Sequence, residues 1–155
     1  MNLAHVHLLL NHIPVLGTVF GLILLIVAVL RKSEELRKVS LGTFVVVTLL
    51  AIPVYLTGDP AEDIVKNLPG VSKSTIDAHD DAAGASLIAL SILGVVSLAG
   101  LILTWKSRPA PRWFATLLLA LSIVATGMMA WTANLGGQIR HSEVRSGGVT
   151  PAPPQ

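Results

Sequence analysis

Residues 82–105 read AAGASLIALSILGVVSLAGLILTW, a run of 24 residues that contains no Asp, Glu, Lys or Arg. A helix needs about 20 mostly apolar residues to cross the hydrocarbon core of a bilayer. Three other uncharged windows approach or exceed that length, at residues 8–30, 41–56 and 113–135. The sequence therefore predicts an all-α fold, an integral membrane four-helix bundle.

The composition agrees with this fold class. Of the 155 residues, 52% are hydrophobic and 13% are charged, with a mean hydropathy of +0.71, whereas soluble domains carry about 25% charged residues. These values exclude a disordered chain, a collagen-like fibre and an ordinary soluble enzyme. Because the chain has no cysteine, it also cannot form disulfides, thiolate metal sites or a covalent CxxCH haem site. A net charge of only +2 gives no reason to expect binding to nucleic acid.

The few charges are sorted between the two sides of the predicted bundle. Residues 31–40 and 106–112 hold seven basic and two acidic residues, whereas residues 57–81 and 136–145 hold four basic and seven acidic ones. The positive-inside rule places the two basic loops in the cytoplasm. Both termini and the long loop of residues 58–81 are then expected on the outer side.

One transmembrane domain is expected over residues 1–145, followed by a mobile tail at residues 146–155. The first span lacks the basic start and the cleavage site of a signal peptide, so we expect it to be retained. The third span is rich in small residues. Such residues let helix backbones approach closely, which predicts either a central position or a subunit interface, as in a homo-oligomer.

Local motifs predict how the spans begin and end. Pro14 removes a helix hydrogen bond and clashes with the preceding turn. It predicts either a helix that starts near Pro14 with Asn11 as its cap, or a kink in a longer first helix that starts near Asn2, and the kinked helix is favoured. Asp59 followed by Pro60 predicts a short surface helix that runs to about Leu68. The pair at residues 136–137, Gly-Gly, predicts the end of the last helix.

Histidine is the residue type that points to chemistry. All five histidines lie on the predicted outer side, at the start of the first helix, the start of the third and the end of the fourth. These ends share one face of an antiparallel bundle, so the imidazoles can converge. The four candidate ligands are His12, His79, His141 and His7. His5 is expected to be an interfacial residue.

Several neutral imidazoles without thiolates suit haem iron, copper, zinc or non-haem iron. A haem b needs only two histidines, and near one membrane face it can exchange electrons with quinone or with a partner protein. The alternative is a copper, zinc or iron site completed by Asp80, Asp81 or Glu143, and a proton relay is a third use. Arg140 is a candidate for pairing with a haem propionate or a lipid phosphate, although an arginine at a helix end also snorkels to the interface without such a partner.

The segments HLLLNHIP (residues 7–14), TGDPAED (57–63), HDDAAG (79–84) and GGQIRHSE (136–143) resemble an uncharacterised family of small bacterial four-span membrane proteins. The resemblance implies that His7, His12, His79 and His141 form a set, and that the chain is a multi-pass protein of the bacterial inner membrane with periplasmic termini. More loosely, the architecture is similar to the cytochrome b membrane subunits of respiratory enzymes, which hold bis-histidine haems. Here the histidines lie at helix ends rather than deep within helices, which favours one haem near the outer face.

Two classes of function follow, and neither is an independent enzyme. No nucleophile motif, phosphate-binding glycine loop or HExxH motif is present in the sequence. The first class is a redox subunit that binds haem b and passes electrons between quinone and other membrane or periplasmic redox subunits. The second is a cofactor-free structural or assembly subunit of a larger membrane complex.

Overall fold

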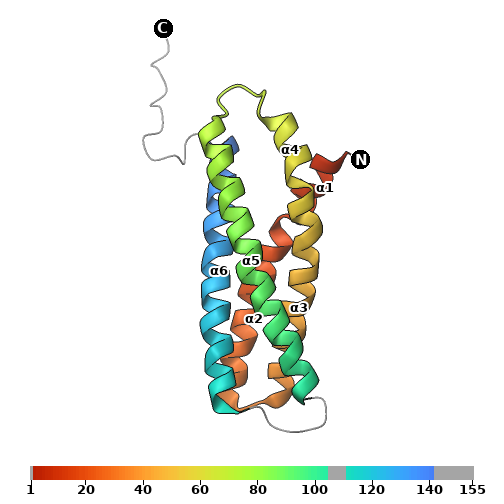
Figure 1. Ribbon diagram of the computed structural model, residues 1–155. Coiled ribbons are helices and arrows are strands. Elements are labelled where there is room, and N and C mark those ends of the chain that lie inside the picture. Colours follow the sequence, from red (N-terminus) through yellow and green to blue (C-terminus); the bar gives the residue numbers. More distant parts are fainter. Residues whose placement is uncertain (1, 105–110, 142–155) are drawn as a thin grey trace.

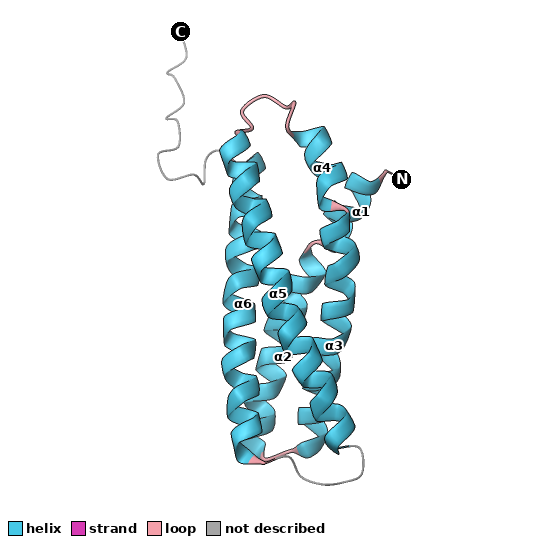
Figure 2. Cartoon of the chain, in the orientation of Figure 1, coloured by secondary structure: helices cyan, strands magenta, loops and turns pink. Residues whose placement is uncertain are grey.

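The computed structural model describes residues 2–104 and 111–141, and every regular element in these ranges is a helix (Figures 1 and 2). The six helices are α1 (Leu3–Leu10), α2 (His12–Arg31), α3 (Glu34–Leu56), α4 (Gly58–Val65), α5 (Lys73–Thr104) and α6 (Arg112–Arg140). The helical segments Leu3–Arg31, Glu34–Leu56, Lys73–Thr104 and Trp113–Arg140 are long and apolar enough to cross a membrane. The all-helical fold and the number of membrane-length helices are therefore confirmed, and the chain is a multi-pass membrane protein.

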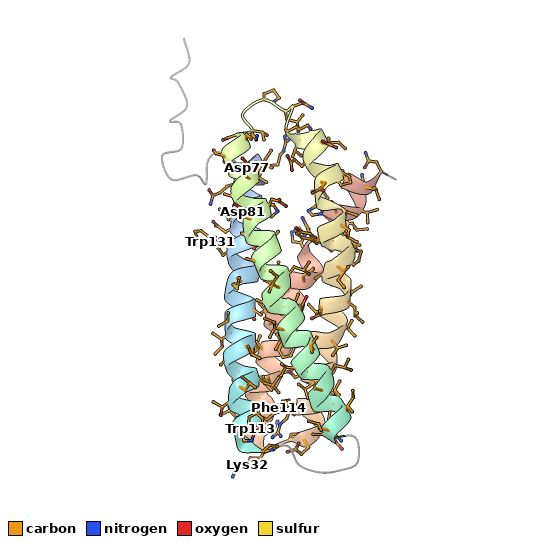
Figure 3. The ribbon with its side chains drawn as sticks, in the orientation of Figure 1. Lys32, Asp77, Asp81, Trp113, Phe114 and Trp131 are labelled. Atoms are coloured by element: carbon orange, nitrogen blue, oxygen red, sulfur yellow. The ribbon has the colours of Figure 1, made fainter. Side chains whose placement is uncertain are left out.

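The four long helices form a closed ring in which α2 packs on α3, α3 on α5, α5 on α6 and α6 on α2 (Figure 1). The short helices α1 and α4 pack against each other at one end of this ring. We call this end, which also holds the start of α5 and the end of α6, the histidine end. The opposite end is the basic end, and Lys32 and Trp113 lie there (Figure 3).

The bundle is most tightly packed between its middle and the basic end. Its fully buried large side chains are Leu25, Phe44, Leu41, Leu90, Leu93 and Leu118. Gly21 packs against the ring of Phe44, and Gly100 packs against the ring of Phe114. The outward faces carry exposed aliphatic side chains such as Ile23, Val46, Val95 and Ile123, which suits contact with lipid rather than water.

Hydroxyl groups tie neighbouring helices together through the bundle. Ser40 Oγ donates to Gly21 O at 2.8 Å, and Thr48 Oγ1 donates to Leu90 O at 3.0 Å. Near the histidine end, Ser86 Oγ and Thr132 Oγ1 lie 2.8 Å apart, which links α5 to α6. These bonds run between helices whose small residues permit close approach, as the composition of the third span predicts.

The first span is interrupted at Asn11 rather than at the proline itself. Asn11 ends α1, and α2 begins at the next residue, so Pro14 occupies the first turn of α2. Proline is tolerated in a first turn because its missing N–H has no partner there. The helix does begin after Asn2, whose side chain accepts a hydrogen bond from His5 N at 3.0 Å.

The helix ends differ from prediction at several places. Helix α4 begins at Gly58 and ends at Val65, and its N-cap is Thr57 rather than Asp59. Helix α6 continues through Gly136 and Gly137 to Arg140, so the prediction that this pair ends the helix was wrong. Helix α3 begins at Glu34, before its apolar window, since backbone hydrogen bonds continue into the polar flank. Helix α5 begins at Lys73, close to Thr75, where Ser74 followed three residues later by Asp77 predicts its start. The predicted mobile tail at residues 146–155 lies outside the described residues.

Candidate functional site

His7 reaches from α1 to the end of α3. Its Nδ1 lies 2.9 Å from Val54 O, with a second, longer contact of 3.4 Å to Thr57 Oγ1. Val54 belongs to the last turn of α3, and its carbonyl also accepts from Thr57, from Oγ1 at 2.9 Å and from the backbone N–H at 3.3 Å. The break at Asn11 makes this contact accessible, because it lets α1 leave the axis of α2 and pack on α4 (Figure 1).

His79 makes the corresponding contact on the other side of the bundle. It is a half-buried residue in the second turn of α5, and its Nδ1 lies 3.0 Å from Thr132 O on α6. Gly136, one turn beyond Thr132, gives the ring its space: a Cβ at this position would lie 2.9 Å from Cε1 of His79. Helix α6 therefore positions the imidazole of His79 in two ways. Thr132 O accepts its hydrogen bond, and Gly136 has no side chain that would collide with the ring.

The two hydrogen bonds define the tautomer of both rings. A carbonyl oxygen can only accept a hydrogen bond, so Nδ1 must carry the proton in His7 and in His79. In a neutral imidazole the lone pair is then on Nε2. Histidines that bind metals commonly have this arrangement, in which one nitrogen donates to a carbonyl and the other is the ligand.

His7 and His79 both lie at the histidine end, on different sides of the bundle. The ring of His7 is bonded to α3 and the ring of His79 to α6. Toward the middle of the bundle, Ser86 and Thr132 are buried below His79, and the next large, fully buried side chain of α5 is Leu90. On the other side, the buried Ile76 precedes His79 by three residues.

The other candidates from the sequence lie at the surface. His12 is exposed at the first position of α2, and the exposed His141 follows α6 directly, its backbone N–H bonded to Gly137 O at 3.0 Å. Arg140 is exposed in the last turn of α6. Hydrogen bonds join His7 to α3 and His79 to α6, and the set of four histidines that the resemblance implied stays a prediction.

Sequence reasoning missed the groups that hold the two rings. The carbonyls of Val54 and Thr132 carry no sequence signal, because every residue has one. Gly136 was interpreted as a helix terminator, and only the register between α5 and α6 shows that it faces His79. Tyr55 was also missed: its hydroxyl lies 3.6 Å from where a Cβ of Gly84 would stand, so it projects from α3 toward α5.

The carboxylates at this end do not join the imidazoles in a larger ligand set. Within residues 2–104 and 111–141, no group of three or more His, Asp or Glu side chains is placed to hold a metal ion. Asp80 and Asp81 are exposed on α5, and Figure 3 shows Asp77 and Asp81 along this part of the helix. Glu143 lies outside the described residues.

A pocket of about 430 Å³ lies between α4 and the start of α5, lined by Glu62, Lys66, Asn67, Lys73 and Ile76. Ile76 is buried, and the two lysines are exposed at the rim. Lys66 Nζ lies 2.6 Å from Asp63 Oδ1, and this hydrogen bond and the charge of Asp63 raise the pKa of Lys66. The pocket therefore combines an apolar residue with cationic side chains.

Comparison with protein-family models, with curated proteins and with solved structures finds no match to this chain.

Proposed function

We propose that the protein is a membrane redox subunit that binds haem b between His7 and His79 and passes electrons between quinone and a partner protein. The observation that carries the proposal is the pair of imidazoles from opposite sides of the bundle, each with Nδ1 bonded to a backbone carbonyl. Bound haem would supply reversible one-electron transfer. The chain's own contribution is to orient both Nε2 lone pairs and to leave small side chains around them.

The number of available ligands favours haem over a bare metal ion. Zinc sites use three or four protein ligands, and the described residues bring no three suitable side chains together. Haem requires only two axial ligands, because the macrocycle supplies the other four nitrogens. Among the described residues a copper, zinc or non-haem iron site would therefore lack a third ligand, whereas a bis-histidine haem would need only His7 and His79.

The membrane orientation is part of the same proposal. The charge bias of the loops places the basic end in the cytoplasm, so that the histidine end and both termini face the periplasm of a bacterial inner membrane. A haem at this end is accessible to periplasmic redox proteins, and the outward aliphatic faces bring quinone in the bilayer close to the bundle.

The absorption spectrum of the full chain purified in detergent tests the proposal. We expect a Soret band and the split visible bands of a low-spin bis-histidine haem, with equimolar haem and iron. His7→Ala and His79→Ala should each abolish the low-spin spectrum. His5→Ala is the matched control, because His5 is exposed on the same helix and contributes only its backbone N–H to the cap at Asn2. A colourless, iron-free protein from haem-replete cells would contradict the proposal.

A structural or assembly subunit is the second candidate, and the same two hydrogen bonds favour it. They join α1 to α3 and α5 to α6, so His7 and His79 also serve as helix-to-helix contacts. This function predicts stoichiometric copurification with other membrane subunits and no cofactor. Loss of either imidazole would then lower the melting temperature without any spectral change.

A further inference from the structure

The pocket between α4 and α5 lies directly beyond the two imidazoles. Gly58 neighbours His7, since a Cβ there would lie 3.9 Å from Cε1 of that ring. Glu62 is four residues further along α4, hence on the same face and about 6 Å higher. On α5, the buried Ile76 comes one turn before His79, again on the same face. Two lining residues of the pocket, Glu62 and Ile76, thus lie about one turn beyond Gly58, which neighbours His7, and beyond His79.

The charges of the pocket suit carboxylates. Its lining has two cations, Lys66 and Lys73, an amide donor, Asn67, and one anion, Glu62. Lys66 is engaged by Asp63, a pair three residues apart with both side chains largely exposed. Such a surface ion pair is weak and exchanges readily for another anion. Lys73 forms no ion pair with any described residue, so its ammonium is available to a ligand.

We propose that this pocket binds the two carboxylates of the haem, with Lys66 and Lys73 as their counter-charges. The inference rests on the proposed haem site and adds the orientation of the ring. If haem is held by His7 and His79, Lys66 and Lys73 would hold its two carboxylates near the loop of residues 66–72. Electron exchange with a water-soluble partner would then take place on this side of the bundle end.

The experiment compares two ligands that differ only in these carboxylates. The full chain, produced without haem and kept in detergent, is titrated with iron protoporphyrin IX and with its dimethyl ester. The unsubstituted chain should bind the diacid more tightly than the ester. Lys66→Gln and Lys73→Gln should each weaken diacid binding by about threefold, and the double variant by about tenfold. Ester binding should not change.

Two further variants sharpen the result. Lys38→Gln, at the basic end, is the matched control and should leave both titrations unchanged. Glu62→Gln removes the one anion of the pocket and should tighten binding of the diacid but not of the ester. Unchanged ester binding shows in every case that the variant is folded and that its imidazoles are in place.

Two other outcomes would contradict either the carboxylate site alone or the whole haem site. If the lysine variants bind both ligands as the unsubstituted chain does, or lose both equally, the pocket is not the carboxylate site, although the haem site stands. If the unsubstituted chain binds neither ligand, the proposed function fails, and the orientation of the ring fails with it.

Discussion

Gly136 lies against the imidazole of His79, so that a methyl group at this position would stand 2.9 Å from Cε1 and 3.2 Å from Nδ1. Contacts of this length require one partner to move. The ring of His79 is the movable partner, yet it is held by its 3.0 Å hydrogen bond to Thr132 O. A glycine on α6 and a histidine on α5 therefore depend on each other for the geometry of the candidate site.

Gly136→Ala should displace His79 and disturb haem binding. Moving the ring breaks a hydrogen bond worth about 1 kcal/mol, which offsets the gain of about 1 kcal/mol that alanine brings to a helix. We expect little change in the melting temperature but loss of the low-spin spectrum, measured by absorption of the purified variant.

The neighbouring glycine supplies the control for this experiment. A Cβ at Gly137 meets nothing within 4 Å, so Gly137→Ala should stabilise α6 by up to about 1 kcal/mol and leave the spectrum unchanged. If both alanine variants keep the spectrum of the unsubstituted chain, His79 does not depend on Gly136.

The hydrogen bond between Ser86 and Thr132 should contribute to stability without affecting the site. Their hydroxyls lie 2.8 Å apart between α5 and α6, and bonds of this kind within membrane proteins average about 0.6 kcal/mol. A double-mutant cycle with Ser86→Ala and Thr132→Val, followed by unfolding in mixed micelles, should give a coupling of that size. Haem absorption should persist, because His79 is bonded to the backbone of Thr132 rather than to its side chain. A coupling of zero would show that the bond makes no contribution.

Gly94 should be essential for packing of α5 on α3. A Cβ there would overlap the side chain of Thr48, which donates to Phe44 O at 2.8 Å and to Leu90 O at 3.0 Å. Overpacking of this kind costs about 1–3 kcal/mol, so Gly94→Ala should lower the melting temperature measured by circular dichroism. Gly42→Ala, on α3, is the matched control, because a Cβ at Gly42 meets nothing within 4 Å. Equal melting temperatures for the two variants would contradict the expected close packing.

Most of the fold could be predicted from the sequence, because hydrocarbon excludes charge. Three of the four uncharged windows lie within membrane-length helices, and the fourth does so up to Thr104, the last described residue of α5, since burial of apolar side chains in lipid and hydrogen bonding of the backbone both require helix there. Helix ends were predicted unevenly. Helix α5 begins at Lys73, two residues from Thr75, where Ser74 followed three residues later by Asp77 predicts its start, whereas α6 runs past its predicted end at residues 136–137 to Arg140.

The candidate site could be predicted only in part, because it depends on the register between helices. His7 and His79 were among the four histidines expected to converge, and both lie at the histidine end, bonded to α3 and to α6 respectively. His12 ranked first from its position beside Pro14, yet the break at Asn11 leaves it exposed. The prediction for the Gly-Gly pair was wrong for a similar reason. Gly136 leaves room for the ring of His79 on the neighbouring helix, and a local sequence pattern does not show which residue of another helix a glycine faces.

The orientation of the bundle can be tested directly, because the chain has no cysteine of its own. Ser74→Cys places an exposed thiol at the histidine end, and Glu35→Cys places one at the basic end. The charge bias predicts that the histidine end faces the periplasm, so a membrane-impermeant maleimide should label Ser74→Cys in intact spheroplasts. The Glu35→Cys variant should be labelled only after the membrane is permeabilised. Labelling of Glu35→Cys in intact spheroplasts, with Ser74→Cys protected, would reverse the orientation and place the histidines and any haem between them at the cytoplasmic face.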